Sequence, residues 1–373
     1  MNVAADARAP AIPETADGLT PAWVSQALAA GGRPGVRVVA VDRRRIGEGV
    51  GILAELHRLQ LTYAPEAAAG PSSLVAKLRS PSPEVRELCG AYGMYEREVR
   101  FYQEVAGAIE LRTPEPYFSA FDPASGDFVI LMEDLAPAAS PDQVAGISLA
   151  DLTAAIDGVA TLHARWWGHP RLAELRAIMP SVVEPPYAPH GAENYRASLP
   201  AALEALRARD HHDLARIAEK VANAFEAMLA AIGAEPLTLG HGDFRVDNLM
   251  FRPTPGGREL TVVDWQIVMQ VRGPYDVGYL MGGAAPVELR RANETALLRR
   301  YHGALIRQGV AGYSFEACEL DYRRAVLFSL VNWVEGAPVL DRSNPRAVAL
   351  FDCWADRLAA AADDLNLEAI VSG

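Results

Sequence analysis

The chain contains little cysteine, and its histidines are not spaced like metal ligands. Its three cysteines, Cys89, Cys318 and Cys353, lie far apart in a sequence of 373 residues. An odd number of widely spaced cysteines disfavours both a disulfide framework and a zinc cluster. The eight histidines include no HxxxH pair of the kind that suggests a metal-ligand set. We therefore expect reduced thiols, as in a cytoplasmic protein.

Long apolar runs and excess positive charge are also missing. Half of the residues are apolar, yet no uninterrupted run approaches the roughly 18 residues that a helix needs to cross a bilayer. Residues 1–8 lack the basic-then-apolar pattern of a signal peptide. The 35 Lys and Arg face 47 Asp and Glu, which gives a net charge of −12 and a pI near 5.2. Without a basic surface, nucleic acid and anionic membrane are disfavoured as partners.

The chain does have a polar cluster in residues 241–248, with the sequence HGDFRVDN, followed by Asp264. Apolar, β-type runs flank these groups, so we expect the polar residues at strand ends and on the loop between the strands. Asp243 and Asn248 stand five residues apart. In a phosphoryl-transfer site, such a first acid orients and deprotonates a hydroxyl, while the Asn and the second Asp hold Mg²⁺ against the nucleotide phosphates.

The same residues also have a plainer interpretation. Asp and Asn are ordinary turn residues, and an Asp–Asn pair at this spacing occurs by chance in many chains. Gly240 and Gly242 bracket His241 and give the backbone the freedom that a tight loop requires. The choice between the two interpretations depends on the order of other features along the chain.

A glycine-rich segment lies upstream, between strand-like runs at residues 36–41 and 52–63. Gly47, Gly49 and Gly51 alternate here, and a hairpin of this kind can bring backbone N–H groups close to phosphates. Three alternating glycines serve a plain turn equally well. The segment also lacks the last glycine of the GxGxxG pattern of protein kinases, so it departs from that pattern.

Lys77 interrupts an apolar, strand-like run at residues 73–78, and a helical segment over residues 84–105 follows. Such a lysine is usually a solvated strand residue. In the helix, Glu98 lies three residues before Phe101, so both share one face and the glutamate can point inward beside the ring. A strand lysine that meets a helix glutamate is the ion pair that positions nucleotide phosphates in kinase-like enzymes.

Residues 127–135 form a buried-strand run that ends in acids and leads into a Pro- and Ala-rich connector. A two-lobed kinase has its hinge at this point. An opening helix is expected from Thr20-Pro21 to the stop signal at Gly31-Gly32. Beyond the connector, apolar periodicity predicts helices at residues 149–167, 203–232, 275–281, 288–308, 315–334 and 345–366.

Five features thus occur in kinase order: the glycine hairpin, the strand lysine, the helix glutamate, the hinge, and the base loop with its metal aspartate. On these features the chain resembles the aminoglycoside phosphotransferase and choline kinase superfamily, in particular its ecdysteroid-kinase-like branch. The resemblance rests on residues 131–135 (LMEDL), 162–167 (LHARWW), 241–251 (HGDFRVDNLMF) and 263–266 (VDWQ). It is strong from residue 45 to residue 283.

This resemblance implies an α+β, two-lobed protein-kinase-like fold. A small antiparallel-sheet lobe with a helix, residues 1–134, would bind the nucleotide. A larger and mostly helical lobe, residues 135–373, would carry out catalysis and bind the acceptor. The cofactors would be ATP and Mg²⁺. The acceptor would be a hydroxyl of an aminoglycoside-, choline-, macrolide- or steroid-like small molecule. ATP versus GTP and the oligomeric state remain open.

The resemblance also implies roles for single residues. Asp243 would be the catalytic base, with Asn248 and Asp264 as metal ligands. Lys77, paired with Glu98, would contact the α- and β-phosphates, and the backbone of the hinge would bind adenine. The residues implied in nucleotide binding are Gly47, Gly49, Gly51, Lys77, Glu98, Glu133 and Leu135.

Three further residues near the base loop receive less defined roles. Arg245 is either a γ-phosphate contact, and so part of the catalytic set, or one partner of a structural salt bridge. His241 is expected to pack the loop, because the base role belongs to Asp243. By resemblance Asp276 would bond back to the loop backbone; the plain alternative is an acid stabilised at the N-terminus of a helix.

The chain departs from protein kinases after Asp264. Trp265 and Gln266 stand where protein kinases have Phe-Gly, and only about ten residues separate Asp264 from the helix near Pro274, too few for an activation segment. A protein acceptor needs that longer platform, so a small molecule is favoured. The alternative is a nucleotide-binding pseudokinase or scaffold, which is disfavoured because all five polar site residues are present.

The acceptor site is the least determined part of the prediction. Aromatic and acidic residues of the helical lobe could bind a cationic acceptor through cation–π and charge contacts, or line a slot for a steroid or macrolide. Tryptophan on an Ala- and Leu-rich helix, however, usually belongs to the core. The candidates are Trp166, Trp167, Tyr187, Trp333, Glu335, Asp341 and Trp354.

Overall fold

The computed structural model describes residues 9–47, 53–68 and 70–372. The chain divides into two compact units, which we call the first and the second unit. The first comprises residues 1–108 and 113–137, and the second comprises residues 109–112 and 138–373. The sequence analysis did not anticipate that the short segment 109–112 belongs with the second unit.

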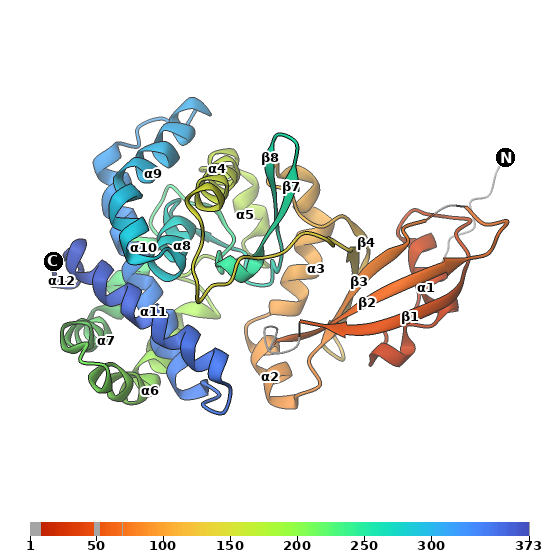
Figure 1. The fold of residues 1–373 in the computed structure, drawn as a ribbon, viewed down its shortest axis with the longest axis horizontal. Coiled ribbons are helices and arrows are strands. Elements are labelled where there is room, and N and C mark those ends of the chain that lie inside the picture. The colour runs from red at the N-terminus through yellow and green to blue at the C-terminus, as the bar shows by residue number, and fades with distance from the viewer. Residues whose placement is uncertain (1–8, 48–52, 69, 373) are drawn as a thin grey trace. The chain divides into compact units, whose positions relative to one another are not determined.

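An antiparallel sheet of five strands forms much of the first unit (Figure 1). The strands are β1 (Val38–Ile46), β2 (Ala54–Tyr63), β3 (Ser73–Arg79), β4 (Pro116–Asp122) and β5 (Asp127–Glu133), in the spatial order β1-β2-β3-β5-β4. The apolar runs that predicted strands at residues 73–78 and 127–135 are β3 and β5, which pair near the centre of the sheet. Both are covered on two faces, which explains why their sequences are almost continuously apolar.

Helices cover the two faces of this sheet. α1 (Pro21–Ala30) begins as predicted, with the Thr20 side chain accepting the backbone N–H of Trp23, and it packs on the face that includes Ala76. α3 (Met94–Glu104) packs on the other face, where the rings of Tyr95 and Phe128 stack with centroids 4.3 Å apart. Because side chains alternate along a strand, Lys77, next to Ala76, points towards α3.

The single helix expected over residues 84–105 is wrong. Two helices occupy this stretch, α2 (Pro83–Ala91) and α3. The helix is interrupted at Gly93, which has a φ of +62°. This is a left-handed conformation that glycine adopts without a Cβ clash.

Most of the second unit is helical. Its helices are α4 (Leu149–Trp166), α5 (Arg171–Leu175), α6 (Tyr187–Ala208), α7 (His212–Ile232), α8 (Tyr275–Ala284), α9 (Val287–Arg307), α10 (Phe315–Gly336), α11 (Pro345–Asp364) and α12 (Leu367–Ser372). Every residue of α8 is buried, and it lies against α10 (Figure 1). Gly278 permits this close contact, because a Cβ there would lie 2.5 Å from the Cβ of Ala325.

The helix expected over residues 203–232 is also wrong, whereas the other five predicted helices agree with α4, α8, α9, α10 and α11 to within a few residues; α5 and α12 were not predicted. α6 begins sixteen residues earlier than expected, at Tyr187, and ends at Ala208. It continues through Pro200, although a proline inside a helix removes one backbone hydrogen bond. The chain then turns through Asp210, whose φ is +59°, before α7 begins.

Two small antiparallel pairs of strands carry the polar cluster of the second unit. β6 (Thr238–Gly240) pairs with β9 (Met269–Val271), a strand that the sequence analysis did not predict. β7 (Leu249–Thr254) pairs with β8 (Gly257–Val262) as a hairpin. The loop of residues 241–248 therefore runs from the end of β6 to the start of β7, and Asp264 follows the end of β8, as the flanking apolar runs predicted.

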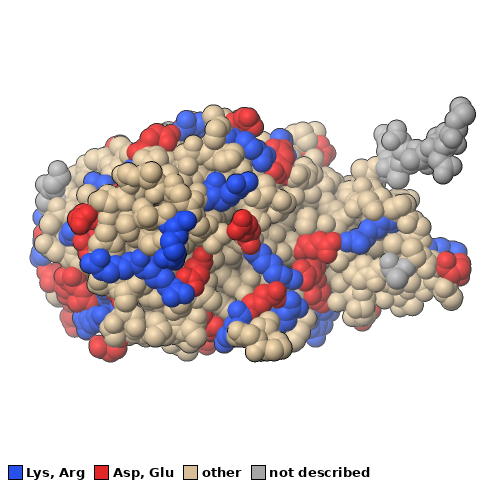
Figure 2. Space-filling model, turned by 90° about the horizontal axis from the view of Figure 1, so that it is seen from above, with Lys and Arg blue, Asp and Glu red and all other residues tan. Residues whose placement is uncertain are grey.

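None of the helices in the described part of the chain is long and apolar enough to cross a membrane. Figure 2 shows acidic and basic side chains interspersed over the face drawn, so the net negative charge of the chain does not gather there into one continuous acidic surface.

Candidate active site

Close packing at Gly242 and hydrogen bonds of the His241 ring restrain the backbone of the loop at residues 241–248. Gly242 has a φ of +86°, and a Cβ there would lie 2.3 Å from the carbonyl oxygen of Ile267. His241 Nε2 lies 3.0 Å from the carbonyl oxygen of Val263, which can only accept. The proton is therefore on Nε2, and Nδ1 accepts the backbone N–H of Asp243 at 3.3 Å. His241 is thus structural, as expected.

Asp276 anchors the start of this loop through hydrogen bonds to its backbone. Its two carboxylate oxygens accept the backbone N–H groups of His241 (2.7 Å) and Gly242 (3.0 Å), and His163 Nε2 lies 3.0 Å from Oδ2. Burial alone would raise the pKa of this fully buried carboxyl, but the hydrogen bond and charge of His163 lower it below the usual value. The contact with the loop backbone, which the resemblance implied, is present, and Asp276 also lies in the first turn of α8, as in the plain alternative.

We expect Asp276→Asn to lower the free energy of unfolding by about 2–3 kcal/mol at neutral pH, because one of the two loop N–H groups would then face an amide NH₂ instead of an oxygen. The folded-state pKa of Asp276 is lowered, so its contribution is complete above the unfolded-state pKa and disappears as the pH falls through the folded-state value. Thermal unfolding at pH 7 measures the loss. The control Glu174→Gln, on a side chain that is 74% exposed, should change the melting temperature little. An equal shift in both variants would contradict the anchoring role.

Asp243 is oriented by three donors. The Tyr279 hydroxyl donates to Oδ1 at 3.1 Å, whereas Asn248 Nδ2 (3.1 Å) and Arg245 Nε (3.3 Å) donate to Oδ2. The Asp243 side chain is 18% exposed. The carboxylate is therefore accessible from solvent, while the three hydrogen bonds fix its orientation. A carboxylate held in this way can accept a proton from a hydroxyl placed against it.

Tyr279 is a site residue that the sequence analysis missed. Burial raises the pKa of its hydroxyl well above the usual value, and the neighbouring Asp243 raises it further, so the hydroxyl remains a donor. The available signal was spacing. Tyr279 follows Asp276 by three residues on α8, and residues three apart share a helix face. Since Asp276 binds the loop backbone, its neighbour on that face reaches the loop as well.

Asn248 and Asp264 are brought together by the β7–β8 hairpin. Leu249 pairs with Val262, and the N–H of Val263 donates to the carbonyl of Asn248 at 3.0 Å, so Asp264 follows directly beside Asn248. Asp264 has a φ of +67°, a strained conformation for a residue other than glycine and one that clusters at functional sites.

These two side chains fit a Mg²⁺ ion. Both hydrogen bonds from Asn248 to Asp243 use the amide nitrogen, which turns that nitrogen, and not Oδ1, towards Asp243. Amide and carboxylate oxygens are the hard ligands that Mg²⁺ prefers. Among the described residues, no group of three or more His, Cys, Asp or Glu could hold a metal ion. Asn248 and Asp264 would be the side chains that hold such an ion.

Arg245 bridges two carboxylates. Its Nε lies 3.3 Å from Asp243 Oδ2, and its Nη1 lies 3.1 Å from Asp247 Oδ2. Burial alone would lower the pKa of the guanidinium, but Asp243 and Asp247, with smaller effects of Tyr279 and Asp264, raise it. The structural salt bridge expected for Arg245 is therefore present. A contact with the γ-phosphate stays a prediction.

In the first unit, Lys77 and Glu98 form a buried ion pair. Lys77 Nζ lies 2.6 Å from Glu98 Oε2, and the two side chains are 6% and 1% exposed. Lys77 is therefore not the solvated strand lysine of the plainer interpretation. The pair forms because β3 points Lys77 towards α3 and because Glu98 lies on the face of α3 that packs against the sheet.

The other nucleotide-binding predictions of the first unit have mixed outcomes. Gly47 follows β1 and has a φ of +73°, as a turn glycine would. Gly49 and Gly51 lie outside the described residues. Glu133 ends β5, and its backbone N–H donates to the carbonyl of Glu115. Leu135, just beyond the strand, is buried. Adenine binding by this segment stays a prediction.

Four of the candidate acceptor residues have clearly different surroundings. Trp166 and Trp333 are core residues, 2% and 0% exposed, and the Trp333 ring stacks on Phe351. Asp341 lies on an exposed turn, where it accepts hydrogen bonds from Ser343. Trp354 lies closer to the site, because its ring contacts that of Tyr279 at 5.9 Å.

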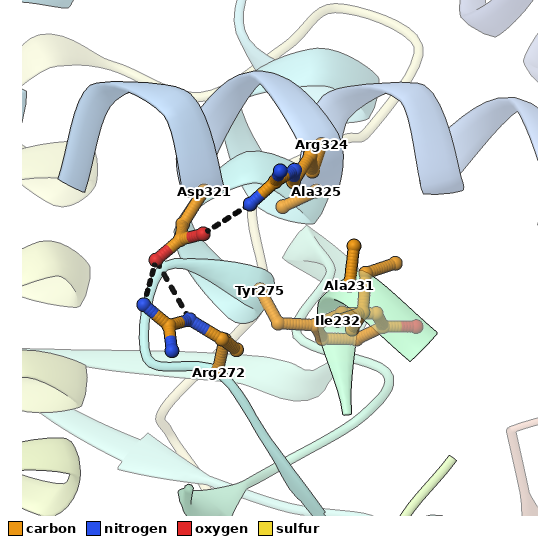
Figure 3. Close-up of a pocket in the computed structure, with 7 residues that line it drawn as sticks. All are labelled: Ala231, Ile232, Arg272, Tyr275, Asp321, Arg324 and Ala325. Carbon is orange, nitrogen blue, oxygen red and sulfur yellow. Dashed lines mark hydrogen bonds and ion pairs between the residues drawn. The ribbon is translucent and has the colours of Figure 1, made fainter. Parts of the chain in front are cut away.

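A small cavity of about 10 Å³ lies next to Tyr275, which is also on α8 (Figure 3). Asp321 on its wall pairs with Arg272 at 2.7 Å and with Arg324 at 3.1 Å. Such a volume holds about one water molecule, so the cavity is too small for a nucleotide or an acceptor. In Figure 3 the Tyr275 hydroxyl points away from these ion pairs.

The α+β architecture and the arrangement of its loop define a protein-kinase-like phosphotransferase fold. Residues 48–309, more than half of the chain, match the ecdysteroid kinase-like family, and the chain belongs to that family. This agrees with the branch that the sequence motifs indicated.

Solved structures share the fold at low sequence identity. Plasmodium vivax ethanolamine kinase has a TM-score of 0.55 and 12% identity, covering 93% of this chain and 89% of its own. The microcompartment-associated aminopropanol kinase has a TM-score of 0.50 and 16% identity, covering 92% and 98%. The GDP complex of aminoglycoside 2'-phosphotransferase-IIIa has a TM-score of 0.50 and 10% identity, covering 86% and 94%. A search of curated proteins found no match.

Proposed function

We propose that the protein transfers the γ-phosphoryl group of ATP to a hydroxyl of a small molecule, with Mg²⁺ as cofactor. The observation that carries the proposal is the Asp243 carboxylate, held by Tyr279 and Asn248 beside Asp264. The structurally similar proteins, an ethanolamine kinase, an aminopropanol kinase and an aminoglycoside phosphotransferase, support the same class of reaction. The GDP in one of them supports a purine nucleotide as the donor.

In the proposed reaction, Asp243 accepts the proton of the acceptor hydroxyl. The hydroxyl oxygen forms a bond to the γ-phosphorus as the bond from that phosphorus to the β-phosphate oxygen breaks. Tyr279 and Asn248 maintain the orientation of the carboxylate, so catalysis is mostly positioning and electrostatic stabilisation. Asn248 and Asp264 would hold Mg²⁺, which neutralises phosphate charge when bound. Lys77, positioned by Glu98, would contact the α- and β-phosphates.

A small-molecule acceptor is supported by the segment after Asp264. Trp265 is fully buried there, its Nε1 donates to the carbonyl of Val262 at 3.0 Å, and its ring contacts that of His241 at 4.6 Å. The chain then forms β9 and enters α8. These residues are used to support the base loop, so they do not form an extended platform for a protein substrate.

Release of ADP in the presence of Mg²⁺-ATP tests the function. We would screen aminoglycosides, macrolides, amino alcohols, sugars and sterols, with Asp243→Asn as the matched inactive variant. ADP release that depends on an acceptor and on Asp243 supports the proposal. Nucleotide binding without turnover on any acceptor would favour the pseudokinase alternative instead.

The metal prediction is tested by thermal stability. ATP should raise the melting temperature much more with Mg²⁺ than with EDTA, because the ion bound by Asn248 and Asp264 contributes to ligand affinity. Asp264→Asn should remove the Mg²⁺-dependent part and leave the unfolding transition of the free protein intact, as Asp264 is a half-buried residue at a strand end. The same ATP-induced shift with Mg²⁺ and with EDTA would count against this metal site.

A further inference from the structure

Arg357 on α11 is a buried cation that has no acidic partner. The residue is 7% exposed and forms no ion pair with any residue that the structure describes. Its guanidinium instead donates to three backbone carbonyls: Nη1 to those of Gln143 (2.8 Å) and Gly283 (3.0 Å), and Nη2 to that of Val144 (2.9 Å). For stability alone an apolar residue would serve a buried position as well. What distinguishes Arg357 is the set of segments that it joins.

Two of the three carbonyls belong to the connector, which we define as residues 138–147. Near its start the connector is attached to the base loop, because the Ser140 hydroxyl donates to the carbonyl of Asp247 at 2.9 Å. At its end the N–H of Ile147 donates to the carbonyl of Ala284 at 3.4 Å. Arg357 therefore holds a segment that extends from the base loop to the end of α8.

The third carbonyl places Arg357 directly at the last turn of α8. Gly283 lies one helical turn after Tyr279, and a cation at the C-terminal end of a helix compensates the partial negative charge of its last carbonyls. Trp354 lies three residues before Arg357, on the same face of α11. Its ring lies edge-on to that of Tyr279, with centroids 5.9 Å apart. Gly283 leaves room for this ring, because a Cβ there would lie 2.9 Å from Trp354 Nε1.

The position of Tyr279 matters because of the hydrogen bonds at Asp243. From the described residues, Oδ2 accepts two side-chain donors, Asn248 and Arg245, whereas Oδ1 accepts only the Tyr279 hydroxyl, at 3.1 Å. Each carboxylate oxygen has about two acceptor positions. Oδ1 thus keeps one position for the proton of an acceptor hydroxyl, and Tyr279 fixes the direction in which that position points.

We propose that Arg357 is a positioning residue for the phosphotransfer. By fixing the last turn of α8 it holds Tyr279, and through Tyr279 it directs the open acceptor position of Asp243 Oδ1 towards the acceptor hydroxyl. This inference rests on the proposed phosphotransferase function. None of the three hydrogen bonds of Arg357 involves Asn248 or Asp264. Loss of Arg357 should therefore impair turnover and leave nucleotide binding intact.

Substitutions at both sides of the contact test the role. Arg357→Met, which keeps an unbranched side chain, should lower kcat about 10- to 100-fold, the effect expected of a small displacement of a reacting group. Its affinity for Mg²⁺-ATP, measured by calorimetry, should match that of the wild type. Arg357→Lys should have an intermediate kcat, because an ammonium lacks the planar fork of the guanidinium. Gly283→Ala changes no charge, and its Cβ must displace Trp354, so it should lower kcat as well.

A double-mutant cycle distinguishes positioning from a general structural role. Tyr279→Phe removes only the hydroxyl that donates to Asp243. If Arg357 acts through this hydroxyl, Arg357→Met should lower kcat by no more than about twofold in the Tyr279→Phe background, because the effects of coupled residues are not additive. A purely structural role would give the same fold loss in both backgrounds. The same cycle with Gly283→Ala tests the proposal even if Arg357→Met does not fold.

Arg346→Met is the matched control. Arg346 also lies on α11 and binds the connector, where its Nη2 lies 3.1 Å from Asp142 Oδ1, but both side chains are 51% exposed. Arg346 makes no hydrogen bond to α8 among the described residues. An exposed ion pair of this kind contributes little, so kcat should stay within about twofold of the wild type.

The outcomes separate this proposal from the proposed function. Equal losses of kcat with and without the Tyr279 hydroxyl, a loss of the same size in Arg346→Met, or weakened Mg²⁺-ATP binding in Arg357→Met would overturn the positioning role and leave the phosphotransferase function standing. Absence of acceptor-dependent ADP release by the wild type, across the whole panel, would overturn the function and the role of Arg357 with it.

Discussion

Asp243→Asn is expected to lower turnover by roughly 10²–10⁴-fold, the usual effect of removing a positioned general base. The asparagine keeps the shape of the side chain and can still meet Tyr279 and Asn248, so the loop should retain its conformation. Affinity for Mg²⁺-ATP should stay close to that of the wild type, because Asp243 acts on the acceptor hydroxyl. Calorimetry of nucleotide binding and turnover on the acceptor found by the screen measure the two effects separately.

Asp247→Asn is the matched control for this variant. Asp247 lies on the same loop and pairs with the same arginine, with Arg245 Nη1 3.1 Å from Oδ2, but it has no proposed part in proton transfer. We expect its turnover to remain within about tenfold of the wild type, as for a contact that acts through a neighbouring side chain. If Asp243→Asn instead lost nucleotide affinity and kept its turnover, Asp243 would not be the catalytic base.

Lys77→Met is expected to reduce kcat/KM for ATP on the order of 10²–10³-fold, since it removes a preorganised cation from the phosphates. The burial of the pair adds a second effect. Glu98, whose side chain is 1% exposed, would lose the cation of this ion pair, and this should cost about 3–5 kcal/mol of stability. An exposed strand lysine would have neither effect.

The double variant Lys77→Met, Glu98→Gln separates binding from folding. It removes both charges, so most of the lost stability should return while ATP use stays low. Lys220→Met is the matched control, because Lys220 is the other lysine of the chain and its side chain is 40% exposed beside Glu368. Wild-type ATP kinetics in the folded double variant would show that the first unit does not position phosphates through Lys77.

Several elements could be predicted because their determinants are local. The Thr20 cap and the proline after it specify the start of α1, and uninterrupted apolar runs specify β3 and β5. The two wrong helix predictions, residues 84–105 and 203–232, each missed a break between two helices. Gly93 and Asp210 turn the chain with positive φ between the two helices of each pair, and periodicity reports which face of a helix is buried but not where the helix ends.

The sequence by itself determined which residue types are available for phosphoryl transfer and that the fold is α+β and kinase-like. The motif around Asp243 and the spacing to Asn248 and Asp264 carried that conclusion. Tertiary structure alone decided how those groups are held. Tyr279 reaches Asp243 only because α8 is anchored to the loop through Asp276. These contacts join positions 34 to 36 residues apart, and no local pattern encodes a distance in space.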